Sequence, residues 1–121
     1  MSVFSTIPTS NWVFETDHFY AIYDMYPTSE GHLLIISKRL SEDFFSLVGE
    51  ERQDLLKAIQ SGKDLLDQRF QPNGYNIGMN CGKDSGQTIF HFHCHLIPRY
   101  TGDVDDPRGG VRHSVIGKGY Y

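Results

Sequence analysis

The sequence predicts an α+β fold, in which a short antiparallel β-sheet packs with one long and one short helix. Short segments rich in aromatic and β-branched residues recur between turn signals, which is typical of strands. A long helical apolar pattern occurs in the middle of the chain, and a short polar loop separates the last two strand-like segments, as between antiparallel neighbours. For a chain of 121 residues we expect one domain over 1–121.

The first part of the chain predicts strands around a loop. Residues 12–23 predict a strand that a turn near 15–17 interrupts, because aromatic and β-branched residues dominate both sides of it. Residues 27–31 predict a loop. The run 32–37 contains four consecutive apolar residues, which indicates a strand covered on both faces.

Two helices follow. Ser41 predicts the start of the short helix, because its hydroxyl can cap the first turn and the acidic Glu42 and Asp43 come next. The long helix is predicted from about residue 50 to residue 70, where Gln-Pro-Asn-Gly ends it. Its apolar residues repeat every three or four positions and form one stripe, namely Leu55, Ile59, Gly62, Leu66 and Phe70.

The last two predicted strands cover residues 75–80 and 89–97. The polar loop 81–87 joins them, and Pro98 is expected to end the second strand. From Arg99 onward the chain shows no period that predicts regular structure.

Composition excludes several classes of protein. The net charge of −4 argues against a module that binds nucleic acid along its backbone. Cys81 and Cys94 are the only cysteines, too few for a disulfide framework or a zinc ribbon. The start of the sequence lacks the features of a signal peptide, and the longest apolar run, residues 19–23, is too short to span a membrane. We therefore expect a cytoplasmic protein with no nucleic-acid or membrane partner.

Three histidines at alternate positions carry the chemistry. Side chains on a strand alternate between faces, so His91, His93 and His95 are expected to line one face. The residues between and beside them, Phe90, Phe92, Cys94 and Leu96, are expected to point into the core.

Such a row can bind a metal ion or an extended anion. His91 and His95 would lie about 13 Å apart on a flat strand, too far to share one ion. Two of the three could chelate an ion with His18 or His32, but we expect no metal. An anionic ligand along the row is favoured, because imidazoles donate to phosphate oxygens and attack phosphorus. The preceding loop adds polar side chains and glycines but does not match a P-loop.

The run 91–97, His-Phe-His-Cys-His-Leu-Ile, resembles the signature His-φ-His-φ-His-φ-φ of the histidine triad (HIT) superfamily of nucleotidyl hydrolases and transferases, where φ is apolar. The resemblance extends over roughly residues 12–100, and the tail 102–112 is similar to a bacterial branch that includes diadenosine-polyphosphate hydrolases. Many relatives carry a Cys-x-x-Cys near the N-terminus that helps to hold zinc, and residues 5–10 contain none. The implied chemistry requires no metal and no cofactor.

The resemblance implies a role for each of four histidines. His93 matches the nucleophile that attacks the α-phosphorus and becomes nucleotidylated. His91 matches the residue whose backbone carbonyl fixes the tautomer of this nucleophile. His95 is similar to a phosphate ligand, and His32 to a buried residue that orients the triad.

The resemblance also implies how the substrate is held. The substrate-binding side chains, ordered from phosphates to base, are Gln87, Thr88, Asn80, Asp24, Ile22 and Met25. The first two match positions near the scissile bridge and the phosphate oxygens, and the third a further phosphate contact. The fourth matches the ligand of the ribose hydroxyls, and the last two flank the base.

These residues predict a hydrolase that cleaves a nucleoside-5′-phosphoryl bond through a covalent nucleotidyl-histidine. The substrate would be a small nucleotide, either a phosphoramidate or a dinucleoside polyphosphate. A nucleotidyltransferase with the same intermediate and a non-catalytic nucleotide-binding module are the alternatives. Family resemblance and small size together imply a homodimer. The sequence does not distinguish adenine from guanine, or a nitrogen from an oxygen leaving group.

Overall fold

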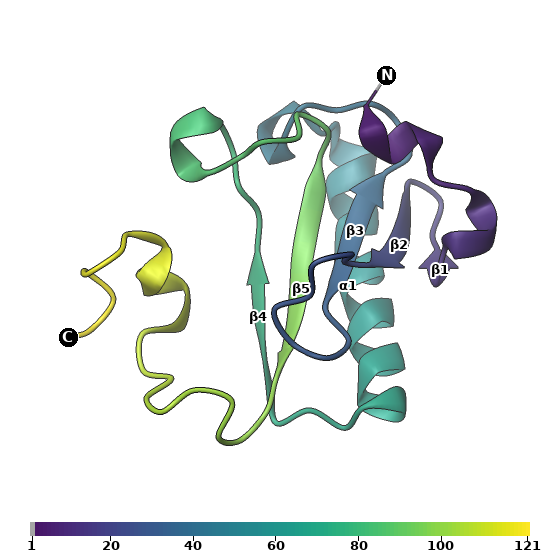
Figure 1. The fold of residues 1–121 in the computed structure, drawn as a ribbon. Helices are drawn as coiled ribbons and strands as arrows, with labels where there is room; N and C mark the ends of the chain where they lie inside the picture. Colours follow the sequence, from purple (N-terminus) through teal and green to yellow (C-terminus); the bar gives the residue numbers. More distant parts are fainter. Residues whose placement is uncertain (1) are drawn as a thin grey trace.

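A computed structural model describes residues 2–121 (Figure 1). Its sheet has five strands in the order β1-β2-β3-β5-β4, and every neighbouring pair is antiparallel, which confirms the predicted fold class. Within the described residues, no helix combines the length and apolar character needed to cross a membrane. The strands are β1 (Phe14–Glu15), β2 (Phe19–Tyr23), β3 (Leu33–Ser37), β4 (Gly74–Gly78) and β5 (His93–Arg99). The helices are α1 (Gly49–Arg69) and the 3₁₀ turns η1 (Val3–Thr6), η2 (Thr9–Asn11), η3 (Phe44–Ser46), η4 (Lys83–Ser85) and η5 (Gly110–Ser114).

The long helix α1 covers one face of the sheet. Its buried residues Leu55 and Ala58 pack with Ile35 of β3 and Cys94 of β5, and Leu66 packs further along the same face. The predicted stripe is therefore confirmed as the side of the helix that faces the sheet. Burial of this apolar stripe is the main source of stability for such a helix.

The opposite face of the sheet carries the histidines. In the pairing of β3 with β5, Ile36 lies opposite His93 and Leu34 opposite His95, and directly paired residues share a face. Phe4 of η1 packs on this face beside Tyr20. The strand alternation thus directs Cys94 toward α1 and its two neighbouring histidines away from it.

The prediction that a short helix begins at Ser41 was wrong. The short helix is the single turn η3, and its cap is Asp43, whose Oδ1 accepts from the backbone N–H of Phe45 at 2.9 Å and of Ser46 at 3.2 Å. Ser41 is buried, and its carbonyl instead accepts a hydrogen bond from the N–H of Phe92 at 2.6 Å.

The predicted limits of the last strand were also wrong. The strand β5 begins at His93, so Phe90 is 46% exposed and does not belong to the core. Pro98 lies inside the strand and does not end it. The carbonyl of Pro98 accepts from the Ser29 hydroxyl at 2.6 Å, on the side where pairing with β3 has already ended at Leu96. Among the described residues, no strand on that side requires the N–H that proline lacks.

Candidate functional site

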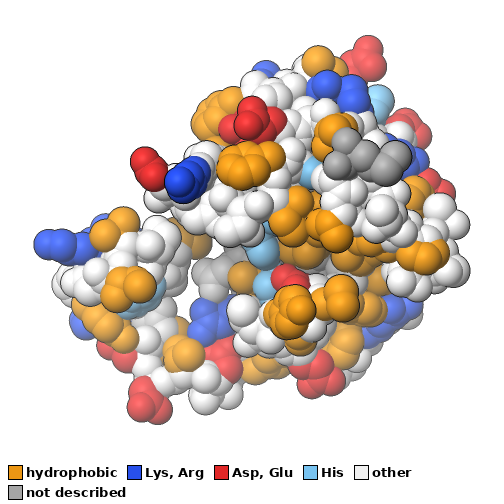
Figure 2. Space-filling view, turned by 45° about the horizontal axis from the view of Figure 1, so that its top comes forward, with side chains coloured by type: hydrophobic (Ala, Val, Ile, Leu, Met, Phe, Trp, Pro, Cys, Tyr) orange, Lys and Arg blue, Asp and Glu red, His pale blue; other side chains and the backbone are white. Residues whose placement is uncertain are grey.

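A cavity of about 530 Å³ opens on the face of the sheet that carries the histidines. Figure 2 shows histidine atoms between hydrophobic side chains at a hollow in this surface. Its polar lining includes His93, His95 and Asp24, and most of its wall is apolar. The apolar wall comes from the N-terminal segment, β2, β3 and the segment before β5, and includes Val3, Phe4, Ile7, Pro8, Ile22, Leu34 and Ile89.

One ring nitrogen of His93 is fixed by the backbone. Its Nδ1 lies 2.8 Å from the carbonyl oxygen of His91. A carbonyl only accepts, so Nδ1 carries the proton and Nε2 of the neutral ring keeps its lone pair. The structure thus gives His93 the tautomer that a nucleophile requires.

The imidazole of His91 is enclosed and bonded at both nitrogens. It is 2% exposed, with Nε2 at 2.7 Å from the carbonyl oxygen of Ser37 and Nδ1 against the hydroxyl of Ser2. Burial lowers the pKa of His91, more than its bond to the Ser37 carbonyl raises it. The side chain of His91 therefore faces protein groups, and the residue reaches the site through its backbone carbonyl.

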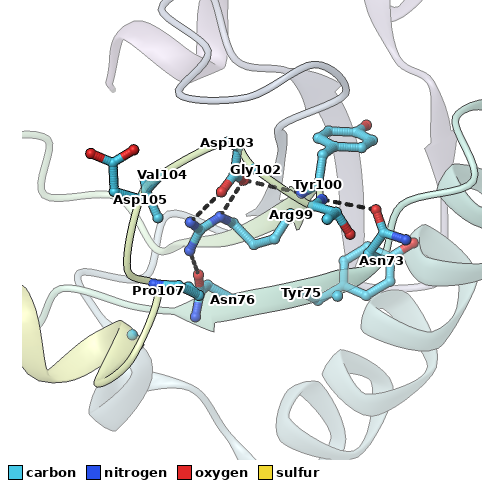
Figure 3. Close-up of a pocket in the computed structure, with 13 residues that line it drawn as sticks. Asn73, Tyr75, Asn76, Arg99, Tyr100, Gly102, Asp103, Val104, Asp105 and Pro107 are labelled. Carbon is cyan, nitrogen blue, oxygen red and sulfur yellow. Dashed lines mark hydrogen bonds and ion pairs between the residues drawn. The ribbon is translucent and has the colours of Figure 1, made fainter.

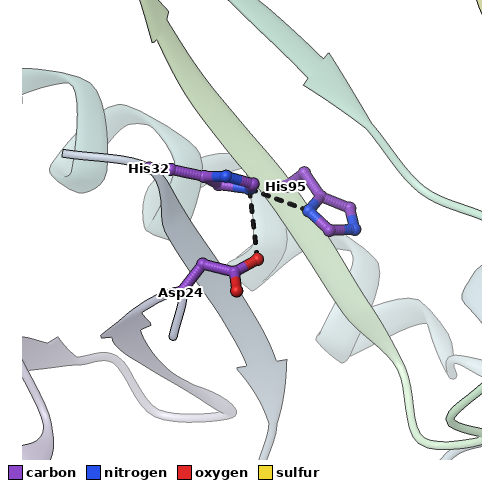
Figure 4. Close-up of side chains that lie close together, drawn as sticks. All are labelled: Asp24, His32 and His95. Atoms are coloured by element: carbon purple, nitrogen blue, oxygen red, sulfur yellow. Dashed lines mark hydrogen bonds and ion pairs between the residues drawn. The ribbon is translucent and has the colours of Figure 1, made fainter. Parts of the chain in front are cut away.

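His32, His95 and Asp24 form a second linked group (Figure 4). The N–H of Thr28 donates to His32 Nδ1 at 3.1 Å, so the proton of neutral His32 is on Nε2. This nitrogen lies 2.9 Å from His95 Nδ1 and 3.5 Å from Asp24 Oδ2. Because His95 Nδ1 accepts a hydrogen bond from this N–H, the proton of the neutral His95 ring is on Nε2.

Burial is also the main influence on the protonation of this group. Burial, together with the neighbouring His32 and His93, lowers the pKa of His95 to about 4, although the Asp24 carboxylate acts in the opposite direction. Burial lowers the pKa of His32 as well, although the Asp24 carboxylate opposes that shift. At neutral pH His95 is therefore an uncharged hydrogen-bond donor.

A tight loop brings Asp24 to His32. The N–H of Asp24 donates to the carbonyl of His32 at 2.9 Å and closes the segment between β2 and β3. Gly31 precedes the histidine at φ +90°, and a Cβ there would lie 2.9 Å from the ring of Phe70. Only glycine fits this close approach without strain.

The same group offers a set of metal ligands. Asp24, His32 and His95 each present one ligand atom, and these atoms lie within 4.8 Å of one another. Two imidazoles and a carboxylate suit Zn²⁺. An ion held there would take the place of the proton between His32 and His95.

The structure brings some of the predicted substrate-binding residues together and leaves others apart. Ile22, Asp24 and Met25 line the same cavity as His93 and His95. The exposed Asn80 lines a neighbouring hollow of about 280 Å³ that includes both His32 and His95.

Gln87 and Thr88 lie outside these cavities. Gln87 is 3% exposed: its Oε1 accepts from the N–H of Gly82 at 2.8 Å, and its Nε2 donates to the carbonyl of Glu42 at 2.7 Å. These two hydrogen bonds of the Gln87 amide hold the loop before β5 in place. A contact between this amide and a substrate would require them to break. Thr88 is exposed on the same loop.

Sequence reasoning missed the contribution of residues 2–8. This segment supplies Val3, Phe4 and Ile7 to the cavity wall and the Ser2 hydroxyl to His91. Its apolar residues stand among serines and threonines with no strand or helix period. The presence of these apolar residues in a polar segment was the one signal that they pack against the rest of the protein.

A further hollow of about 520 Å³ lies beside β4 and the start of the tail (Figure 3). Its main cation is already paired, since Arg99 binds Asp103 through Nε and Nη2, both at 2.8 Å, and donates from Nη1 to Asn76 at 2.7 Å. No histidine lines it. The cavity of His93 is therefore the better candidate for chemistry.

Comparison with known proteins identifies the family of the chain. The sequence model of the HIT domain family matches residues 6–102 of the chain. An uncharacterized HIT-like protein of Methanocaldococcus jannaschii is 35% identical over 91 residues, which are 75% of this chain and 70% of that protein. The crystal structure of a HIT family protein from Bacillus anthracis gives a TM-score of 0.72 at 35% identity, over 77% of this chain and 66% of that chain.

Two similar proteins have enzyme names. The asymmetrical bis(5′-nucleosyl)-tetraphosphatase of Schizosaccharomyces pombe is 32% identical over 85% of this chain and 57% of its own length. The AP-4-A phosphorylase of Mycobacterium tuberculosis is 30% identical over 71% of this chain and 45% of its own length. The chain thus spans less than two thirds of either enzyme. Because the family model matches most of its residues, the chain belongs to the HIT domain family.

Proposed function

We propose that the protein is a nucleotide hydrolase that cleaves a nucleoside-5′-phosphoryl bond through a nucleotidyl-His93 intermediate. The observation that carries this proposal is the hydrogen bond from His93 Nδ1 to the carbonyl of His91 at 2.8 Å, on a histidine that lines an apolar cavity. It leaves Nε2 unprotonated beside a space of a size that suits a nucleoside.

The other groups around the cavity fit the substrate. The apolar wall suits the faces of a purine base, and the carboxylate of Asp24 accepts hydrogen bonds from ribose hydroxyls. The Nε2–H of His95 donates to a non-bridging phosphate oxygen, and Asn80 supplies a further donor. Fixed donors of this kind stabilise the charge that develops on the phosphoryl group.

The reaction proceeds in two displacements. His93 Nε2 forms a bond to the α-phosphorus while the bond from phosphorus to the leaving oxygen or nitrogen breaks, and the leaving group takes up a proton from solvent. Water then attacks the same phosphorus and releases a proton to solvent, the P–N bond breaks, and the nucleoside monophosphate leaves with His93 restored. The covalent step divides one difficult hydrolysis into two easier ones.

A nucleotidyltransferase is the second candidate. The phosphorylase name of the mycobacterial relative favours it, because a phosphate acceptor in place of water in the second step would release a nucleoside diphosphate. Both reactions share the first step, so they differ only in the acceptor. A homodimer is part of the same proposal.

Denaturing mass spectrometry with product analysis tests the proposal. Wild type and His93→Gly are mixed with adenosine phosphoramidate or with diadenosine tetraphosphate, with and without inorganic phosphate. We expect release of AMP, an adduct of one AMP on wild type, and a loss of turnover on the order of 10³-fold or more in the variant. His18→Gly, in the turn between β1 and β2 and outside the cavity, is the matched control. ADP formed only with phosphate would favour the transferase, and nucleotide binding without turnover would leave a binding module.

A further inference from the structure

The side chain of Ser2 reaches the histidine that supports the nucleophile. Its hydroxyl lies against Nδ1 of the buried His91, while the Nε2 of the same ring faces the carbonyl of Ser37 at 2.7 Å. The carbonyl requires the proton of the neutral ring on Nε2. Nδ1 is therefore an acceptor, and the Ser2 hydroxyl is its donor.

Neighbouring contacts hold Ser2 in this position. Its Oγ also accepts from the backbone N–H of Phe4 at 3.2 Å, which caps η1. The carbonyl of Phe4 accepts from the hydroxyl of Tyr20 at 2.9 Å. The Phe4 ring then packs edge-on against both His91 and His93, with ring centroids 5.6 and 5.0 Å apart.

We propose, on the basis of the function proposed above, that Ser2 is a positioning residue for the reaction. It holds the His91 ring in one tautomer and one orientation, so that the His91 carbonyl stays aimed at Nδ1 of His93. Ser2 does not line the cavity, whereas Val3, Phe4 and Thr6 do. Its loss should therefore reduce kcat and leave KM nearly unchanged.

Three variants separate this role from a structural one. Ser2→Ala removes the hydroxyl, and Ser2→Thr keeps it. Ser5→Ala is the matched control, because the Ser5 hydroxyl faces the Ser2 backbone N–H at 3.4 Å and caps the same turn without reaching His91. Steady-state kinetics are measured on each full-length chain, together with the ¹⁵N signals of the imidazole rings.

In wild type we expect His91 to be protonated at Nε2 and unprotonated at Nδ1. Ser2→Ala should shift the Nδ1 signal and lower kcat about ten-fold, which is typical when a partner that orients a functional histidine is removed. Its KM should change less than about two-fold. Ser2→Thr should restore both kcat and the ring signals, and Ser5→Ala should match wild type.

Several results would overturn the inference. They are a wild-type His91 protonated at Nδ1, a Ser2→Ala protein with unchanged kcat and ring signals, or equal losses in Ser2→Ala and Ser5→Ala with unchanged ring signals. The ring spectra require no turnover. If wild type released no nucleotide product, the proposed function would fail, and the wild-type and Ser2→Ala spectra would still decide whether Ser2 fixes the His91 ring.

Discussion

Each of the four histidines around the cavity has its tautomer set by a neighbour within the chain. His91 donates to the Ser37 carbonyl, and His93 donates to the His91 carbonyl. His32 accepts from the Thr28 N–H and donates its Nε2–H to His95. Together these bonds leave one lone pair, on His93, and one donor, on His95, for a ligand. The cavity therefore offers an acceptor and a donor from neighbouring rings, as the proposed reaction requires.

The lowered pKa of His95 predicts a loss of stability in mild acid. Its pKa is about 4 in the fold, against an ordinary value of 6.5, so the unfolded chain binds more protons between these values. The contribution of His95 to the free energy of unfolding is fully present above about pH 6.5, and it is lost as the pH falls toward 4. Urea denaturation at several pH values should show the midpoint decreasing over this window.

His95→Gln provides the comparison for this prediction, because glutamine does not titrate. We expect a shallower decrease of the urea midpoint in this variant, by the share that His95 contributes. The lowered pKa values of His32 and His91 should leave part of the decrease in place. His113→Gln should retain the wild-type slope, and an identical slope in His95→Gln would contradict the assignment to His95.

At the scale of elements, α1 lies close against the sheet at Gly62. A Cβ there would lie 2.8 Å from Leu96 Cδ2 and 3.5 Å from Leu33 Cδ1, and both leucines are fully buried. Gly62→Ala gains about 1 kcal/mol of helix propensity but overpacks the core, which costs about 1–3 kcal/mol. We expect a net destabilisation of about 1 kcal/mol in urea unfolding.

Gly49→Ala is the control at the start of the same helix, where a Cβ would meet nothing within 4 Å. We expect it to be neutral or slightly stabilising. Equal effects at the two glycines would mean that contact with the sheet does not decide the result at Gly62.

Local patterns predicted the elements better than their ends. Alternation of apolar residues with histidines identified β5 and its two faces, and the stripe from Leu55 to Leu66 identified α1. The start of β5 depends on a bond from the Phe92 N–H to the Ser41 carbonyl, which joins segments distant in the chain. No local pattern around either residue shows that contact.

The candidate site shows the same division. The two triad histidines that line the cavity could be predicted from their alternate spacing, whereas Asp24 could be predicted only from the family resemblance. The link from Ser2 to His91 spans 89 positions, and a serine near a chain end has no distinguishing pattern. The bonds that hold Gln87 were hidden for the same reason, since its partners are backbone groups.

At the scale of the whole molecule, the sheet separates two tasks. The face under α1 holds a continuous apolar core, and the other face holds the cavity and its polar groups. The tail after β5 does not enter the core, because no residue beyond 96 belongs to the three clusters of buried hydrophobic residues. One tail residue, Val111, lines the hollow that includes His32 and His95. Figure 1 shows it extending beside the outer strand β4.

Apolar residues of this tail are exposed in one copy of the chain. Val111 and Val115 are each 62% exposed and Ile116 is 94% exposed. Val111 lies beside β4, which is the last strand at one edge of the described sheet. Exposed apolar side chains beside a free strand edge favour association. We therefore expect the full chain to be a dimer that uses this region.

A chain that ends at Val104 tests this expectation, because it keeps the Arg99–Asp103 ion pair. It removes Val111, Val115 and Ile116. Sedimentation should show a dimer for the full chain and a monomer for the shortened one. Both should unfold cooperatively, since the three core clusters are intact, and the urea midpoint of the dimeric full chain should be the higher of the two and rise with protein concentration. A monomeric full chain would contradict the homodimer. A shortened chain that still dimerises would place the interface outside the tail, along the edge of β4 or elsewhere.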